Sequence, residues 1–179
     1  LSHHGYSGHN GASWQSRSRR VRWTCGQIIN AIGLAIAPVQ TTAELIPSDW
    51  DQIDLVVIEG PSYGSQHGAQ FDRIGVWHGV FAAFDARNIP IAVVAPKTRT
   101  RWATGKGTDD KRTVYEAVKS DWTGVKLAAF NEGGNDEADA LTMAAMGALH
   151  LGDDLPIALP QWRINGLTSV AWPEVVKAG

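Results

Sequence analysis

Ile53-Asp54-Leu55-Val56-Val57-Ile58-Glu59-Gly60 is the stretch that decides the fold of this 179-residue chain. Its first six residues form an apolar, mostly β-branched run that only Asp54 interrupts. Such runs are typical of strands with both faces buried, as in parallel sheets. The pattern therefore predicts a buried strand over residues 53–58, with Glu59 directly after it.

Helical and strand patterns alternate on either side of this strand. The expected elements are a helix over Ser13–Ala37 capped by Ser13 or Ser16, the strand over 53–58, a helix over about Gly68–Asn88, a strand over Ile91–Ala95, a helix capped by Thr108, a short strand over Leu127–Phe130, and a helix from Asn135 to about Leu151. This alternation predicts an α/β fold with a parallel sheet.

The remaining segments are expected to be irregular. They are a polar terminus over 1–12, a basic, glycine-containing loop over 96–107, and a proline-containing tail over 152–179. The length suits one domain with a full core, so we expect a single domain over residues 1–179.

Composition limits the class of protein. No run of 18 or more apolar residues occurs, so the sequence predicts no membrane span. A single cysteine, Cys25, excludes an internal disulfide framework and fits a reducing, cytoplasmic compartment. Because Cys25 falls within an expected helix, we interpret it as a buried structural thiol.

Basic residues are concentrated in two segments, although the formal net charge is −2. Residues 1–43 contain four arginines and no acidic residue, and residues 97–112 contain six basic and two acidic residues. Two interpretations are open: a groove for a polyanion, or two solvated faces. On the first, the candidate DNA-binding residues are Arg19, Arg22, Arg99, Arg101, Lys106, Lys111 and Arg112.

Three carboxylates stand out by position. Glu59 follows a buried strand, where ligands bind in open α/β sheets, and Asp136 and Asp139 are three residues apart at the start of a helix. Converging carboxylates repel each other and need cations, and hard oxygen ligands select magnesium or manganese. Two such ions about 4 Å apart activate water for phosphodiester hydrolysis. Taken singly, each residue also fits a salt-bridged strand end or a dipole-stabilising helix start.

Three motifs, in order, resemble those of RuvC-type Holliday-junction resolvases in the ribonuclease H-like superfamily. Val57-Ile58-Glu59-Gly60 resembles their strand-end glutamate, and Asp136–Leu141 resembles their final Asp-x-x-Asp-Ala motif. Gly105–Lys111 is similar to the family's Gly-x-Gly-x-x-x-Lys stretch. Bacteriophage members are the most similar in these motifs.

The resemblance implies a fold, a partner and a chemistry. The fold would be a ribonuclease H-like mixed sheet flanked by helices, and the protein would be a homodimer that makes magnesium-dependent cuts in branched DNA during recombination and repair. Glu59, Asp136 and Asp139 would bind the metal, and Lys111 would contact the scissile phosphate. Tyr63 is the candidate for stacking on junction bases, with a turn tyrosine as the alternative interpretation.

One family feature is absent from this chain. The family's first catalytic aspartate lies on an N-terminal strand, in an Asp-x-Ser type motif before a three-strand meander. This chain has no aspartate before Asp49. We therefore expect that the chain begins after those strands. The alternative functions are a non-cleaving module that binds branched DNA, and a nuclease of the same fold for flaps, forks or RNA–DNA hybrids.

The expected helix over Gly68–Asn88 has two distinctive faces. One carries Phe71, Ile74, Trp77, Phe81 and Phe84, and the other carries the small residues Gly75, Gly79 and Ala83. Small residues let two helices approach closely, so we expect this second face at a two-fold dimer contact, which would match the symmetry of a four-way junction. The alternative is that it packs within the same chain.

Overall fold

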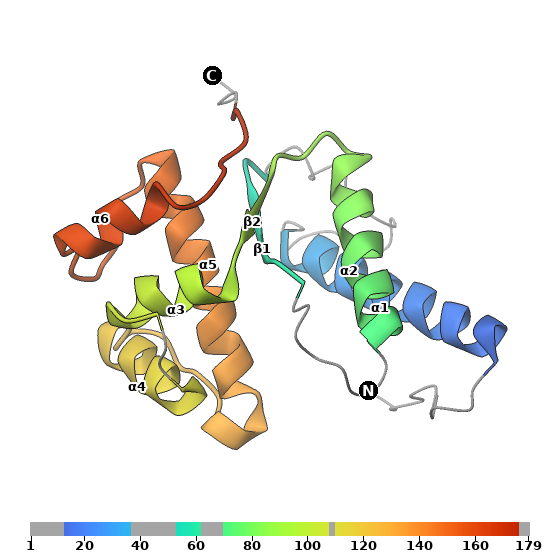
Figure 1. Cartoon of the computed structure of the whole chain (residues 1–179), viewed down its shortest axis with the longest axis horizontal. Helices are drawn as coiled ribbons and strands as arrows, with labels where there is room; N and C mark the ends of the chain where they lie inside the picture. The colour runs from blue at the N-terminus through green and yellow to red at the C-terminus, as the bar shows by residue number, and fades with distance from the viewer. Residues whose placement is uncertain (1–12, 37–52, 62–69, 108–109, 176–179) are drawn as a thin grey trace. The chain divides into compact units, whose positions relative to one another are not determined.

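The computed structural model describes residues 13–36, 53–61, 70–107 and 110–175. The sequence predicted one domain, and the structure divides the chain into two compact units. Among the described residues, the first unit contains helices α1 and α2, and the second contains the two strands and the later helices (Figure 1). Tyr63 and the polar terminus lie outside the described residues.

The first unit pairs α1 (Trp14–Ile36) with α2 (Gln70–Asp85) through small residues. A Cβ atom added at Gly75 would lie 3.4 Å from Val21, and one at Gly79 would lie 2.6 Å from the Sγ atom of Cys25. The small face of α2 therefore packs on α1 of the same chain. Our expectation of a two-fold contact on this face is thus corrected.

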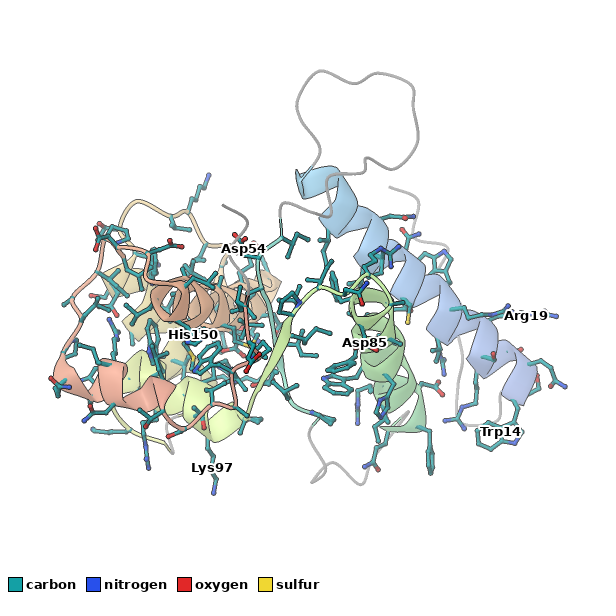
Figure 2. The ribbon with its side chains drawn as sticks, turned by 90° about the horizontal axis from the view of Figure 1, so that it is seen from above. Trp14, Arg19, Asp54, Asp85, Lys97 and His150 are labelled. Atoms are coloured by element: carbon teal, nitrogen blue, oxygen red, sulfur yellow. The ribbon has the colours of Figure 1, made fainter. Side chains whose placement is uncertain are left out.

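A buried carboxylate also joins these two helices. Asp72 on α2 is 7% exposed, and it accepts a 2.8 Å hydrogen bond from Arg17 Nε and forms an ion pair with Arg20. Arg19 and Arg22 remain exposed, and Figure 2 shows Arg19 pointing away from α1. Two of the four arginines expected on a basic face are therefore committed to packing within the unit.

The second unit contains a parallel pair of strands, β1 (Val56–Glu59) and β2 (Ile91–Val94), which lie side by side in Figure 1. Their register pairs Glu59 with Val94, and Gly60 donates a 2.8 Å hydrogen bond to the Val94 carbonyl. Both strands overlap the apolar runs that predicted them, but β1 covers 56–59 rather than 53–58, none of its residues is fully buried, and Val93 on β2 is 38% exposed. In the described residues the fold is mixed α/β, mostly helical, with a two-stranded parallel sheet.

The second unit also contains the helices that follow β2 in the chain. They are α3 (Pro96–Thr104), α4 (Lys111–Asp121), the 3₁₀ helix η2 (Phe130–Glu132), α5 (Gly134–Leu151) and α6 (Gln161–Leu167). One core cluster includes Val94, Trp102 and Met146, and a second includes Val114 and Ala138. Helix α5 lies close against β1, because a Cβ atom at Gly147 would be 2.8 Å from a methyl group of Val57. No helix within the described ranges is both long enough and apolar enough to span a bilayer.

Three segments differ from the sequence predictions. The expected loop over 96–107 contains α3, because Trp102 and Ala103 are buried. The expected strand over 127–130 is replaced by extended residues that lead into η2. The expected irregular tail contains α6, and Trp172 stacks on His150 of α5 at 4.2 Å between ring centroids.

Two helix starts also differ by a few residues. Asp110, rather than Thr108, caps α4, and its carboxylate accepts a 2.9 Å hydrogen bond from the Thr113 N–H group. That hydrogen bond lowers the pKa of Asp110, because it favours the charged form. Helix α5 begins after Gly133 without a side-chain cap, so Asn135 lies inside its first turn.

Candidate functional site

Glu59 ends β1 at the carboxyl edge of the two strands. Its backbone is fixed by the register with Val94 on β2, and its side chain is 35% exposed. This edge is where open α/β sheets usually bind ligands. The local sequence therefore places a partly exposed carboxylate at a defined position, as the sequence predicted.

Asp139 reaches the same place from the second turn of α5. The turn before this helix depends on two glycines: Gly133 adopts a left-handed φ of 98°, and a Cβ atom at Gly134 would collide with the carbonyl oxygen of Ala128. Left-handed backbone favours glycine because it lacks a Cβ atom. The glycine pair thus fixes where α5 starts, and the side chain of Asp139 is 19% exposed.

Arg99 on α3 lies between these two carboxylates. Its Nε atom donates a 2.7 Å hydrogen bond to Glu59 Oε1, and its Nη1 atom donates to Asp139 Oδ1. The residue is 8% exposed. One buried guanidinium group therefore binds a carboxylate from β1 and a carboxylate from α5, and it neutralises part of their combined charge.

Asp136 and Lys111 form the outer, exposed part of the same cluster. The Nζ atom of Lys111, at the start of α4, lies 4.0 Å from Asp136 Oδ1, and the two side chains are 69% and 78% exposed. An exposed ion pair of this length contributes little to folding stability. Lys111 therefore makes only a weak ion pair with Asp136, and its charged group lies beside the carboxylates.

Electrostatics confirm that these groups influence one another. Burial raises the pKa of Asp139, and the negative charges of Glu59 and Asp136 raise it further, whereas Arg99 and Lys111 lower it. A raised carboxyl pKa means that the ionised form is less favourable in the folded protein than in water. Cations beside Asp139 therefore favour its ionised form, against the effect of burial.

Arg99 joins Glu59 and Asp139, and Lys111 lies 4.0 Å from Asp136, but the assignment of these residues to one metal site stays a prediction. Within the described ranges, however, no three His, Cys, Asp or Glu side chains form a group that could hold a metal ion in this arrangement. Arg99 is the residue that sequence reasoning misplaced: we expected it on the DNA-binding surface, and it is buried between two carboxylates. Residues three and four positions apart lie on the same face of a helix. The burial of Trp102 and Ala103 therefore indicates that Arg99 also faces the interior.

The other predicted basic residues of the second unit are exposed. They are Arg101, Lys106, Lys111 and Arg112. The turn holding Lys106 is fixed by Thr104, whose hydroxyl accepts from the Lys106 N–H group at 3.1 Å, and the Arg112 guanidinium lies 4.5 Å from the centre of the Phe130 ring. Lys97, which we had not selected, also projects outward from α3 (Figure 2).

Comparison with known proteins identifies the fold but no family. No protein-family model and no curated protein matches the sequence. Among solved structures, the chain is similar to RuvC from Thermus thermophilus, with a TM-score of 0.53 and 15% sequence identity over 79% of this chain and 75% of that chain. At this identity the similarity shows a RuvC-like fold and nothing finer.

Proposed function

We propose that this protein is a RuvC-like, magnesium-dependent endonuclease that cleaves Holliday junctions and related branched DNA. The observation that supports this most directly is the convergence of Glu59 and Asp139 on one positive charge at the carboxyl edge of the strands. Exposed basic residues suited to phosphate binding accompany these carboxylates in the same unit. The RuvC-like fold is consistent with this chemistry.

The carboxylates suit a hard divalent cation. Glu59 and Asp139 already place oxygen atoms around a shared cationic group, and Asp136 lies close enough to change the charge balance of Asp139. Oxygen donors of this kind select Mg²⁺ or Mn²⁺. When bound, such an ion activates water and stabilises charge on the phosphate oxygens. We assign Glu59, Asp136 and Asp139 as its protein ligands.

The basic residues have separate proposed roles. Lys111, beside Asp136, is placed to hold a phosphate oxygen near the carboxylates. Arg101, Lys106 and Arg112 would bind the DNA backbone, which positions a substrate without reading its sequence. A homodimer would give the paired cuts that a two-fold symmetric junction requires.

The direct test is cleavage of a synthetic four-way junction beside a linear duplex of the same sequence. We expect cuts in the junction with Mg²⁺ or Mn²⁺, none with a chelator, and little cleavage of the duplex. Tight junction binding without cutting in either metal would instead identify a non-cleaving binding module. Faster cleavage of flaps, forks or RNA–DNA hybrids than of the four-way junction would identify a nuclease of the same fold that acts on those substrates.

The non-cleaving module is favoured by one specific observation. Arg99 neutralises the two carboxylates that the nuclease would need for metal binding. A protein that only binds branched DNA would keep such an ion pair permanently, because it has no use for a metal ion at that position. The metal dependence of the junction assay therefore decides between the two functions.

The proposed DNA surface predicts a change in salt dependence. Each protein cation that neutralises a phosphate releases counterions, so the slope of log affinity against log salt reports the number of such contacts. The double variant Arg101→Ala/Arg112→Ala should flatten this slope by about two units. The matched control is Lys119→Ala/Lys126→Ala, which removes two exposed cations of the same unit and should leave the slope unchanged. Equal slopes for the wild type and the first variant would exclude Arg101 and Arg112 from the DNA contact.

A further inference from the structure

The position of Arg99 is unusual for an arginine on a basic segment. Arg101 and Lys106, close to it in sequence, are exposed, whereas Arg99 is 8% exposed and donates to Glu59 at 2.7 Å and to Asp139. Burying an arginine is costly unless its donors are paired with good geometry. Two carboxylates from two other elements meet that requirement.

The guanidinium group also stabilises the two carboxylates that it binds. Glu59 and Asp139 carry like charges that repel when they face one point, and a positive charge between them removes that repulsion. A divalent cation held by the same two oxygen atoms would supply the same compensation. The guanidinium and such an ion would also repel each other if both occupied this position.

We propose that Arg99 is a built-in counter-cation that competes with a divalent metal ion for Glu59 and Asp139. This inference rests on the proposed metal site. Metal binding then requires the guanidinium to leave both carboxylates, so Arg99 lowers the metal affinity of the protein. In the absence of metal, the same contacts hold the ends of β1, α3 and α5 together.

The test measures Mn²⁺ binding to the full chain without DNA, using the loss of the electron paramagnetic resonance signal of free Mn²⁺. Arg99→Gln removes the competing charge, and it should bind Mn²⁺ about 10-fold more tightly than the wild type, a typical size for coupling between two binding events. Arg101→Gln is the matched control: it removes the same charge from an exposed position on the same helix and should change the affinity by about twofold or less.

Melting temperatures and a second variant, Arg99→Lys, distinguish a change in metal affinity from misfolding. Arg99→Gln leaves the carboxylates without a cation, so its melting temperature without metal should fall, and saturating Mn²⁺ should raise it more than it raises that of the wild type. Arg99→Lys keeps the charge and loses the paired hydrogen bonds to the two carboxylates. Its Mn²⁺ affinity should therefore lie between that of the wild type and that of Arg99→Gln. Circular dichroism establishes that each variant is folded.

The outcomes separate this inference from the proposed function. If the wild type binds Mn²⁺ and Asp139→Asn does not, but Arg99→Gln binds no more tightly than the wild type, the competition is disproved while the metal site stands. If neither the wild type nor Arg99→Gln binds Mn²⁺, the competition and the metal-dependent function both fail. Tighter binding by Arg99→Gln and an unchanged Arg101→Gln support the proposal.

Discussion

Replacing Glu59 by Gln or Asp139 by Asn should each lower the rate of junction cleavage by about 1,000-fold, since a metal ion stabilises the transition state by several kcal/mol and each 1.4 kcal/mol is a factor of ten. Both substitutions keep the shape of the side chain and remove its charge. Because neither residue belongs to the proposed DNA surface, junction affinity in a chelator should not weaken. Single-turnover cleavage and a binding titration, run on the same preparations, measure the two quantities.

The control for these variants is Glu137→Gln. Glu137 lies in the first turn of α5, next to Asp136, but its carboxylate accepts a 2.7 Å hydrogen bond from the Ala128 N–H group and takes no part in the proposed site. An amide oxygen can accept the same bond, so cleavage should stay near the wild-type rate. Retention of cleavage within about 10-fold in both Glu59→Gln and Asp139→Asn would contradict the roles of these residues, because each factor of ten is only about 1.4 kcal/mol.

Arg163→Met should lower the free energy of unfolding of the second unit by about 3 kcal/mol, since several buried polar groups would lose their partner. Arg163 is 4% exposed and donates to the carbonyl oxygens of Trp102 at 3.1 Å, Ala103 at 3.1 Å and Ala158 at 2.8 Å, and it pairs with Asp121. The first two carbonyls belong to the last turn of α3, which lacks partners within the helix. Urea unfolding, followed by circular dichroism, measures the loss.

A second substitution divides this effect into its parts. Asp121→Asn removes the ion pair and leaves the three carbonyl bonds of Arg163, and the Asp121 side chain is 30% exposed. Solvent screens a pair of that kind, so the variant should lose only about 1 kcal/mol. If Arg163→Met were no less stable than Asp121→Asn, the capping of α3 by Arg163 would be energetically unimportant.

The elements predicted most reliably were those with strong local patterns. The β-branched run before Glu59 and the run over Ile91–Val94 form strands, because β-branched side chains suit the pleated strand conformation. The final acidic pair lies at the start of α5, as expected. These patterns predicted the elements that carry the three carboxylates, because each depends on a short stretch of sequence, whereas their role in a site stays a prediction.

The misassigned elements depend on distant contacts. Helix α3 is rich in Lys, Arg and Thr, and what makes it a buried helix is the core around Trp102 and its cap from Arg163, 60 residues later in the chain. The role of Arg99 likewise depends on Glu59 and Asp139, each 40 residues away. A sequence alone does not distinguish a buried arginine from its exposed neighbours, because their local composition is the same.

The small face of α2 was misinterpreted for a similar reason. Gly75 and Gly79 indicate a close helix approach, and the sequence contains no information on whether the approaching helix belongs to the same chain. The structure identifies α1 as that helix. The proposed homodimer therefore needs a different surface, and no dimer contact is assigned to α2.

The contact between Gly79 and Cys25 has a practical consequence. Cys25 is the chain's single cysteine, its thiol faces the α2 backbone, and burial raises its pKa, so little of it is thiolate at neutral pH. Alkylating reagents attack the thiolate, and the contact with α2 slows their access to this partly buried sulfur atom. The rate of modification of this single thiol, followed by mass spectrometry, therefore reports how closely α1 and α2 pack around it.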